Sequence, residues 1–172
     1  MKSRLTPLAA SLAVLVGLHF ATRLYSERAR PLQQRAFYSD DYATALALVA
    51  GKGFIGLDLA DDPRPEAEVL RRFLRLDAAE VPGSILERYA LGARPAPASL
   101  LASTRVLELR WAALVWRALG VRWSVLFASY AALSALVGLL VFLLGRRLGG
   151  GNRAGLLAAL IFLASPLETE SL

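Results

Sequence analysis

Two adjacent aspartates, Asp40 and Asp41, follow an apolar N-terminal block and a short basic stretch. A carboxylate held near a membrane surface can accept a proton from an incoming hydroxyl, which is the task of a general base. Aspartate also caps helices, and either residue could be the N-cap of a short helix that begins at Tyr42. The pair therefore has two interpretations, a catalytic base and a helix cap.

Four arginines further along the chain could hold a phosphate group through forked hydrogen bonds. They are Arg71, Arg72, Arg105 and Arg110. The ordinary alternative for each is a solvated helix face or a contact with lipid headgroups. The chain has no cysteine, which excludes disulfides and thiolate metal sites within it. We find no metal-ligand cluster and no nucleic-acid-binding motif, and no nucleic acid is expected as a partner.

Three uncharged blocks hold much of the apolar content of a chain that is 56% hydrophobic. They run from Leu5 to Thr22, from Ser124 to Gly145 and from Ala154 to Leu167. As helices they would extend about 27, 33 and 21 Å, against a hydrocarbon core about 30 Å thick. We therefore expect an all-α membrane protein with two full transmembrane helices and a third, apparently incomplete one. A cleaved signal peptide is the competing interpretation of the first block, whose length favours an uncleaved anchor.

The distribution of charge predicts the orientation of the chain. Arg146, Arg147 and Arg153 surround the turn between the second and third blocks, with no acidic residue among them. The segment 25–123 instead carries fourteen basic and twelve acidic side chains, and the whole chain has a net charge of +6. The positive-inside rule places the short basic turn in the cytoplasm. Residues 25–123 are then extracytoplasmic and the N-terminus cytoplasmic, in a membrane expected to be the bacterial inner (plasma) membrane.

The extracytoplasmic loop is expected to form short juxtamembrane helices. Helix signals predict one helix over 42–50, ended by glycines, and another that opens at Asp61-Asp62-Pro63. A longer helix over 99–119 places apolar residues on one stripe: Leu100, Leu107, Trp111, Leu114 and Ala118. The three tryptophans fall just before the second span, and indole prefers the headgroup level. This helix is therefore expected to lie in the outer membrane interface.

Several motifs follow one another in a distinctive order. After the first apolar block come Tyr-Ser-Asp-Asp-Tyr at 38–42 and Ala-Leu-Val-Ala-Gly-Lys-Gly-Phe at 47–54. Leu-Leu-Gly-Arg-Arg-Leu-Gly-Gly at 143–150 and the apolar run 154–166 come later. In this order they resemble the N-terminal part of the GT-C membrane glycosyltransferases, multispan enzymes that include the dolichyl-phosphate-mannose protein mannosyltransferases. The similarity covers nearly the whole chain and is weakest over 55–97.

The resemblance implies transfer of a sugar from a polyprenyl-phosphate-linked donor to an acceptor hydroxyl, with inversion at the anomeric carbon. It implies that an aspartate of the first extracytoplasmic loop deprotonates the acceptor, a role that would fall to Asp40 or Asp41. A cation would neutralise the departing lipid phosphate. Some relatives use a divalent metal, which could recruit the same carboxylates. The partners implied are the lipid bilayer, the lipid-linked sugar donor and further membrane helices or subunits.

The expected organisation has five parts: an N-terminal transmembrane anchor (1–24), an extracytoplasmic loop (25–123), a second transmembrane helix (124–145), a cytoplasmic turn (146–153) and the start of a third helix (154–172). Relatives have many more spans, so we interpret the chain as an N-terminal fragment or a truncated relative. The 172 residues alone are not expected to catalyse transfer. The alternative is a small non-catalytic membrane subunit that packs in a larger membrane complex.

Overall fold

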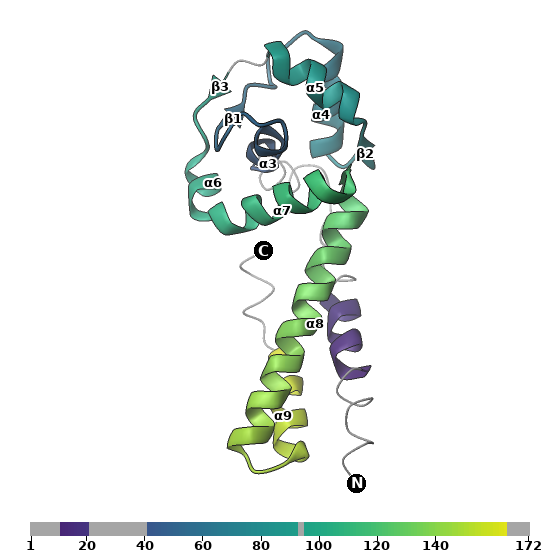
Figure 1. The fold of residues 1–172 in the computed structure, drawn as a ribbon, viewed down its shortest axis with the longest axis vertical. Coiled ribbons are helices and arrows are strands. Elements are labelled where there is room, and N and C mark those ends of the chain that lie inside the picture. The colour runs from purple at the N-terminus through teal and green to yellow at the C-terminus, as the bar shows by residue number, and fades with distance from the viewer. Residues whose placement is uncertain (1–10, 21–40, 93–94, 165–172) are drawn as a thin grey trace. The chain divides into compact units, whose positions relative to one another are not determined.

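The structure, a computed structural model, describes residues 11–20, 41–92 and 95–164 (Figure 1). Helices make up 72% of these residues, which confirms the prediction of a mainly helical chain. The contacts divide the chain into two compact units. Unit 1 comprises Met1–Tyr25 with Ala128–Leu172, and unit 2 comprises Ser26–Phe127.

Unit 2 consists of short helices joined by two small antiparallel strand pairs. Its described elements are α3 (Tyr42–Val49), β1 (Gly56–Leu57), α4 (Pro65–Leu74), β2 (Glu80–Val81), α5 (Gly83–Gly92), β3 (Pro95–Ala96), α6 (Leu100–Thr104), α7 (Val106–Leu119) and β4 (Val121–Arg122). Strand β1 pairs with β3, with Gly56 opposite Ala96, and β2 pairs with β4, with Val81 opposite Val121. Each pair joins segments that are distant in the sequence.

The ends of the first two helices follow from local chemistry. Helix α3 ends before Gly51, whose φ of 75° suits glycine, and the Lys52 N–H donates back to the Ala47 carbonyl at 2.9 Å. Helix α4 begins at Pro65, later than the opening expected at 61–63. The Asp62 carboxylate accepts a hydrogen bond from the Arg64 backbone N–H at 3.0 Å, and this local turn delays the start of the helix.

Four aromatic side chains form the centre of unit 2. Tyr42 of α3, Phe73 of α4, Trp116 of α7 and Trp123 at the start of α8 have ring centroids 4.9–5.8 Å apart in five pairs. The Trp116 indole N–H donates to the Arg122 carbonyl at 3.0 Å, and that of Trp123 donates to the Phe73 carbonyl at 2.8 Å. The cluster therefore buries large apolar rings without leaving either indole N–H unsatisfied.

The segment expected to be one helix over 99–119 is two helices separated by Arg105. Helix α7 buries one face, which includes Leu109, Ala112 and Trp116, and exposes Leu107 and Leu114 on the other. Two of the three tryptophans, Trp116 and Trp123, are buried in the protein core. The expected place of this helix at the headgroup level stays a prediction.

The described part of unit 1 is the helix Ser11–Phe20, the body of α8 (Trp123–Leu148) and α9 (Asn152–Ala164). Of the described helices, α8 alone is long and apolar enough to cross a membrane. Two full transmembrane helices are thus not shown, since only part of the predicted first span lies among the described residues. Because α8 extends through Leu148, Arg146 and Arg147 belong to its last turn, and the connection to α9 is shorter than the expected 146–153.

Close helix contacts in unit 1 depend on small residues. A Cβ added at Gly17 would lie 2.6 Å from the Ala131 carbonyl oxygen, and one at Gly155 would lie 2.6 Å from that of Phe142. The outward faces carry large apolar side chains that the described residues leave exposed, including Leu140, Leu144 and Leu160. A contiguous apolar surface of this kind indicates contact with lipid or with other helices.

Replacing Trp116 with alanine tests the aromatic centre of unit 2. We expect Trp116→Ala to lower the free energy of unfolding by about 3–5 kcal/mol, since it leaves a cavity among three aromatic rings. Chemical denaturation of the chain in detergent, followed by near-UV circular dichroism, measures the change. Leu107→Ala is the matched control on the opposite face of α7, and we expect it to stay within about 0.5 kcal/mol of the parent. Equal losses in the two variants would contradict this account.

Candidate functional site

Asp41, at the start of α3, is the predicted catalytic residue that the structure describes; Asp40 lies outside the described residues. The Asp41 side chain is only 4% exposed. Its Oδ1 accepts a hydrogen bond from the Ser99 hydroxyl at 2.6 Å, and its Oδ2 lies 3.5 Å from Nη1 of Arg105. The carboxylate thus connects α3 to the segment that leads through α6 into α7.

Arg105 links this carboxylate to a second one. Its Nε and Nη2 donate to the two carboxylate oxygens of Glu108 at 2.7 and 2.5 Å, and the Tyr42 hydroxyl donates to Glu108 Oε1 at 2.6 Å. Asp41, Tyr42, Ser99, Arg105 and Glu108 form what we call the Asp41 cluster. Its single guanidinium lies between two carboxylates, and hydroxyl donors from Tyr42 and Ser99 complete the network.

The pKa of Arg105 reflects these opposing influences. Burial lowers it, but the hydrogen bonds and charge of Glu108, with smaller contributions from Tyr42 and Asp41, outweigh burial and raise the pKa above its ordinary value. The guanidinium therefore stays charged at every physiological pH. The guanidinium supplies a positive charge beside both carboxylates of the cluster.

The geometry bears on both interpretations of Asp41. The residue occupies the N-cap position of α3 but makes no side-chain capping hydrogen bond, so helix capping does not explain it. As a general base it would need an oxygen that an acceptor hydroxyl can reach. Both oxygens have protein partners and the side chain is buried, so Asp41 serves in this conformation to fix the start of α3 against α7.

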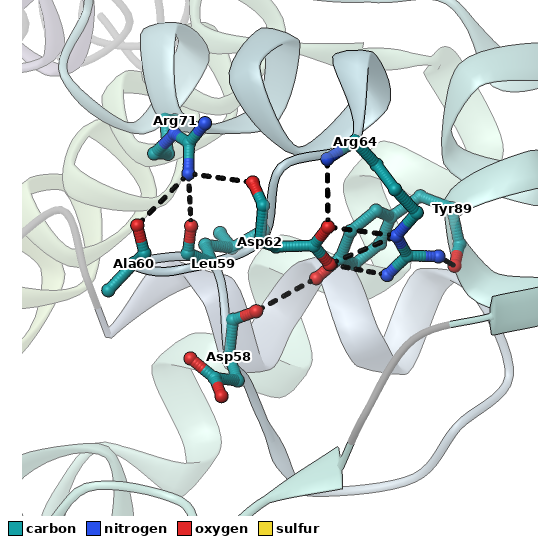
Figure 2. Close-up of polar contacts among 7 residues, drawn as sticks. All are labelled: Asp58, Leu59, Ala60, Asp62, Arg64, Arg71 and Tyr89. Atoms are coloured by element: carbon teal, nitrogen blue, oxygen red, sulfur yellow. Dashed lines mark hydrogen bonds and ion pairs between the residues drawn. The ribbon is translucent and has the colours of Figure 1, made fainter.

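Arg71 is occupied by backbone carbonyls. Its Nη1 donates to the carbonyls of Leu59, Ala60 and Asp62 at 2.5, 3.1 and 3.1 Å (Figure 2). Its Nε donates to the Glu68 carboxylate at 3.0 Å. These hydrogen bonds pair the backbone carbonyls of the loop before α4 without the need for water. Arg71 therefore holds the loop before α4, and its guanidinium is not directed at an open phosphate site.

A neighbouring ion pair clamps this loop to α5 (Figure 2). The Arg64 guanidinium forms a two-pronged pair with Asp62, donates to the Tyr89 carbonyl at 3.4 Å and lies 4.4 Å from the centroid of the Tyr89 ring. The Tyr89 hydroxyl donates to the Asp58 carbonyl at 3.2 Å. Hydrogen bonds from Arg64 hold the pKa of Asp62 well below its usual value, although burial acts in the opposite direction. This cluster has a structural role.

The four predicted phosphate-binding arginines do not come together as one site. Arg71 contacts the loop before α4, and Arg105 belongs to the Asp41 cluster. Arg72 and Arg110 are exposed, on α4 and α7 respectively. Only Arg105 contacts a predicted catalytic aspartate among the described residues.

A cleft of about 800 Å³ opens elsewhere in unit 2. It lies between the C-terminal ends of α3 and α7, helix α5 and the β2–β4 pair, with Trp116 and Leu86 among its apolar lining and Lys52, Glu87 and Arg117 among its charged lining. Asp41 and the four arginines are not in its lining. The cleft is thus separate from the site that the sequence predicted.

The described residues also bear on the divalent metal allowed by the resemblance. Within 11–20, 41–92 and 95–164, no three His, Cys, Asp or Glu side chains are grouped so that they could hold a metal ion. Asp41 contributes one carboxylate, which is bonded to Ser99 and Arg105. This part of the chain does not fit a metal site.

Three members of the Asp41 cluster were not predicted from the sequence: Tyr42, Ser99 and Glu108. Glu108 follows Arg105 by three residues, a spacing that brings helical side chains together and could have indicated the pair. Ser99 accepts a hydrogen bond from the Ala102 N–H at 2.9 Å, as a helix N-cap does. A serine directly before a helix is a sequence signal for this capping role. Its bond to Asp41, 58 residues away, has no local signal.

Comparison of the chain with protein-family models, with curated proteins and with solved structures finds no match.

Replacing Ser99 with alanine tests the Asp41 cluster. It removes one donor from a buried carboxylate and one helix cap, so we expect the free energy of unfolding to fall by about 1–3 kcal/mol. Ser103→Ala is the matched control, since the Ser103 hydroxyl makes an exposed hydrogen bond to the Ser99 carbonyl. Chemical denaturation compares the two variants. A Ser99 variant as stable as the Ser103 variant would show that the Asp41–Ser99 bond contributes little.

The pH dependence of Asp62 gives a second test. Because the folded-state pKa of Asp62 is lowered, its contribution to stability is present above the unfolded pKa, near 4, and is lost as the pH falls below it. We expect Asp62→Asn to melt at a lower temperature than the parent at pH 7, with the gap narrowing toward pH 3. Asp61→Asn is the adjacent exposed control. A gap that does not change with pH would contradict the role of the Asp62 charge.

Proposed function

We propose that this chain is the N-terminal portion of a membrane glycosyltransferase that transfers a sugar from a polyprenyl-phosphate-linked donor to an acceptor hydroxyl. The support is the order of the motifs in the sequence together with one structural observation. Asp41 opens α3 and ties that opening to the segment that runs through α7 into α8, the candidate membrane-spanning helix. The acidic motif is thereby linked to the point where the chain would enter the bilayer.

The proposed topology has two full spans, one over 1–24 and one formed by α8. Residues 25–123 are proposed to lie outside the cytoplasm of a bacterial inner membrane, with the N-terminus inside. Arg146, Arg147 and Arg153 are all exposed near the α8–α9 turn, as a cytoplasmic anchor against translocation requires. The exposed leucines of α8 and α9 supply the apolar surface that lipid or further helices would cover.

The two aspartates are proposed to have different roles. In the reaction, a carboxylate takes the proton of the acceptor hydroxyl while the hydroxyl oxygen attacks the anomeric carbon. The lipid phosphate leaves from the opposite side of that carbon. Asp41 has both oxygens engaged and is buried, so its proposed role is to position the start of α3. The base role then falls to Asp40. Arg72 and Arg110, which are exposed, remain the candidates for a phosphate.

A small non-catalytic membrane subunit is the second candidate. The observation that favours it is the separation of the 800 Å³ cleft from Asp41, because a transferase needs substrate space beside its base. The coding sequence beyond Leu172 distinguishes the two. Continuation into further apolar blocks supports the transferase, whereas a stop codon at that point supports the subunit.

Asparagine substitutions test the division of roles between the two aspartates, in a longer chain that contains these residues and is active. We expect Asp40→Asn to reduce sugar transfer from a polyprenyl-phosphate donor by about 10²–10⁴-fold, without changing the melting temperature, because only the proton acceptor is lost. We expect Asp41→Asn to lower the melting temperature and the rate together. The opposite pattern, with a selective loss of activity in Asp41→Asn, would assign the base to Asp41. Full activity in both variants would refute the proposed chemistry.

A further inference from the structure

The 800 Å³ cleft of unit 2 has the size of a ligand-binding site. Pockets that enclose small ligands commonly have volumes of about 300–1,000 Å³. Every residue of the cleft lining belongs to unit 2, from the ends of α3 and α7, from α5 and from the β2–β4 pair (Figure 1). Neither Asp41 nor the four arginines line it, so the proposed sugar transfer leaves the cleft without a role.

The floor of the cleft is formed by buried apolar side chains. Trp116, Leu86 and Val121 belong to the lining and are at most 5% exposed. The Trp116 indole N–H donates to the Arg122 carbonyl, so the orientation of the ring is fixed. Leu91, also in the lining, is 87% exposed and continues the apolar surface toward solvent. The floor therefore suits an aliphatic or aromatic side chain of a ligand.

Charges of opposite sign line the cleft on different elements. Lys52 follows α3 and Arg117 is on α7, whereas Glu87 is on α5; all three are exposed. Within the described ranges, neither Lys52 nor Glu87 takes part in a salt bridge. The α3–α7 side of the cleft thus offers cations, and the α5 side offers a carboxylate.

The backbone around Lys52 keeps its side chain at the cleft. Gly51 and Gly53 have φ angles of 75° and 85°, and the Lys52 N–H donates to the Ala47 carbonyl at 2.9 Å. No atom lies within 4 Å of a Cβ built at either glycine, so the loop stands clear of its neighbours. The Gly-Lys-Gly motif therefore presents a cation with open space around it.

The other charged residues of the lining already have partners. Arg122 pairs with Glu80 at 3.0 Å, across the β2–β4 pair. Arg117 Nη2 donates to the Leu48 and Val49 carbonyls at 2.9 and 3.4 Å, which fixes its guanidinium at the end of α3. The charge of Arg117 is not neutralised by these carbonyls, so it adds to the positive field around Lys52.

This distribution of charge selects among the ligands that an apolar floor accepts. A purely anionic amphiphile would be attracted to Lys52 and Arg117 but repelled by Glu87, and a purely cationic one would meet the opposite conflict. A peptide carries apolar, acidic and basic side chains along one short chain. Clefts that bind peptides commonly take an anchoring side chain in an apolar pocket and read the charges beside it.

We propose that the cleft binds a peptide segment of a partner protein, in which an apolar side chain lies between an acidic and a basic one. The apolar side chain packs on Trp116 and Leu86, the acidic one lies beside Lys52 and Arg117, and the basic one lies beside Glu87. This binding depends neither on the glycosyltransferase activity nor on the membrane span of α8.

Selection from a library of random seven-residue peptides displayed on phage tests the proposal. The target is the full chain, purified in detergent and immobilised. Selected peptides are synthesised with a fluorescent label, and their Kd is measured by anisotropy. We expect them to share an apolar residue with acidic and basic neighbours, and replacement of that apolar residue by alanine to weaken binding about 10–100-fold.

Variants of the chain locate the bound peptide. We expect Lys52→Gln and Glu87→Gln each to weaken binding about two- to five-fold, because each removes one exposed charge pair. The loss in Lys52→Gln should vanish for a peptide whose acidic residue is replaced by glutamine. Arg75→Gln and Asp77→Asn are the matched controls, exposed residues outside the cleft lining that we expect to leave the Kd unchanged.

Four results would overturn the proposal. One is a lack of enrichment over a surface that carries detergent alone. A second is selection of peptides with charges of one sign only. A third is an equal Kd in the parent, Lys52→Gln and Glu87→Gln chains, which would place the peptide outside the cleft. In the fourth, dihexanoyl phosphatidic acid displaces the labelled peptide at a lower concentration than the unlabelled peptide does, which would assign the cleft to a lipid.

Discussion

The packing of Tyr42, Phe73, Trp116 and Trp123 is the interaction on which unit 2 depends. These rings come from four different helices, and each side chain of this size buries roughly 150–250 Å². Both indole N–H groups donate to backbone carbonyls, so ring orientation is fixed as well as ring position. The start of α3 is held next to α7 by this packing, and the Asp41 cluster can form only because that distance is set.

The Asp41 cluster is a polar feature beside an apolar core. A buried carboxylate is tolerated when hydrogen-bond donors and a counter-charge surround it. A polar group that lacks a hydrogen-bond partner weakens a buried network of this kind. Arg105 has an i,i+3 partner in Glu108 and a long-range partner in Asp41, so it joins a local helix pair to a contact between distant segments. Asp41 is therefore part of a protein network and has little contact with solvent.

Local signals account for much of the fold. Gly51 and Asp61-Asp62-Pro63 marked the end of α3 and the approximate start of α4, and hydropathy marked α8. The burial of Trp116 and Trp123 in the core was not predicted, because α7 is apolar on two faces and periodicity alone does not show which face meets Phe73. Within the candidate site, Asp41 was predicted, but its bond to Ser99 was not, since that contact depends on tertiary packing.

The connection between α7 and α8 is short and held at several points. Gly120 has a φ of 92°, Val121 and Arg122 pair with β2, and the Trp123 backbone N–H donates to the Ala79 carbonyl at 3.3 Å. One inserted residue would have to break the pairing of β2 with β4 or move Trp123 away from Phe73, because these contacts fix both ends of the connection. The junction therefore fixes the first turn of α8 to unit 2, and length variation between related chains should be absent at this point even where surface loops vary.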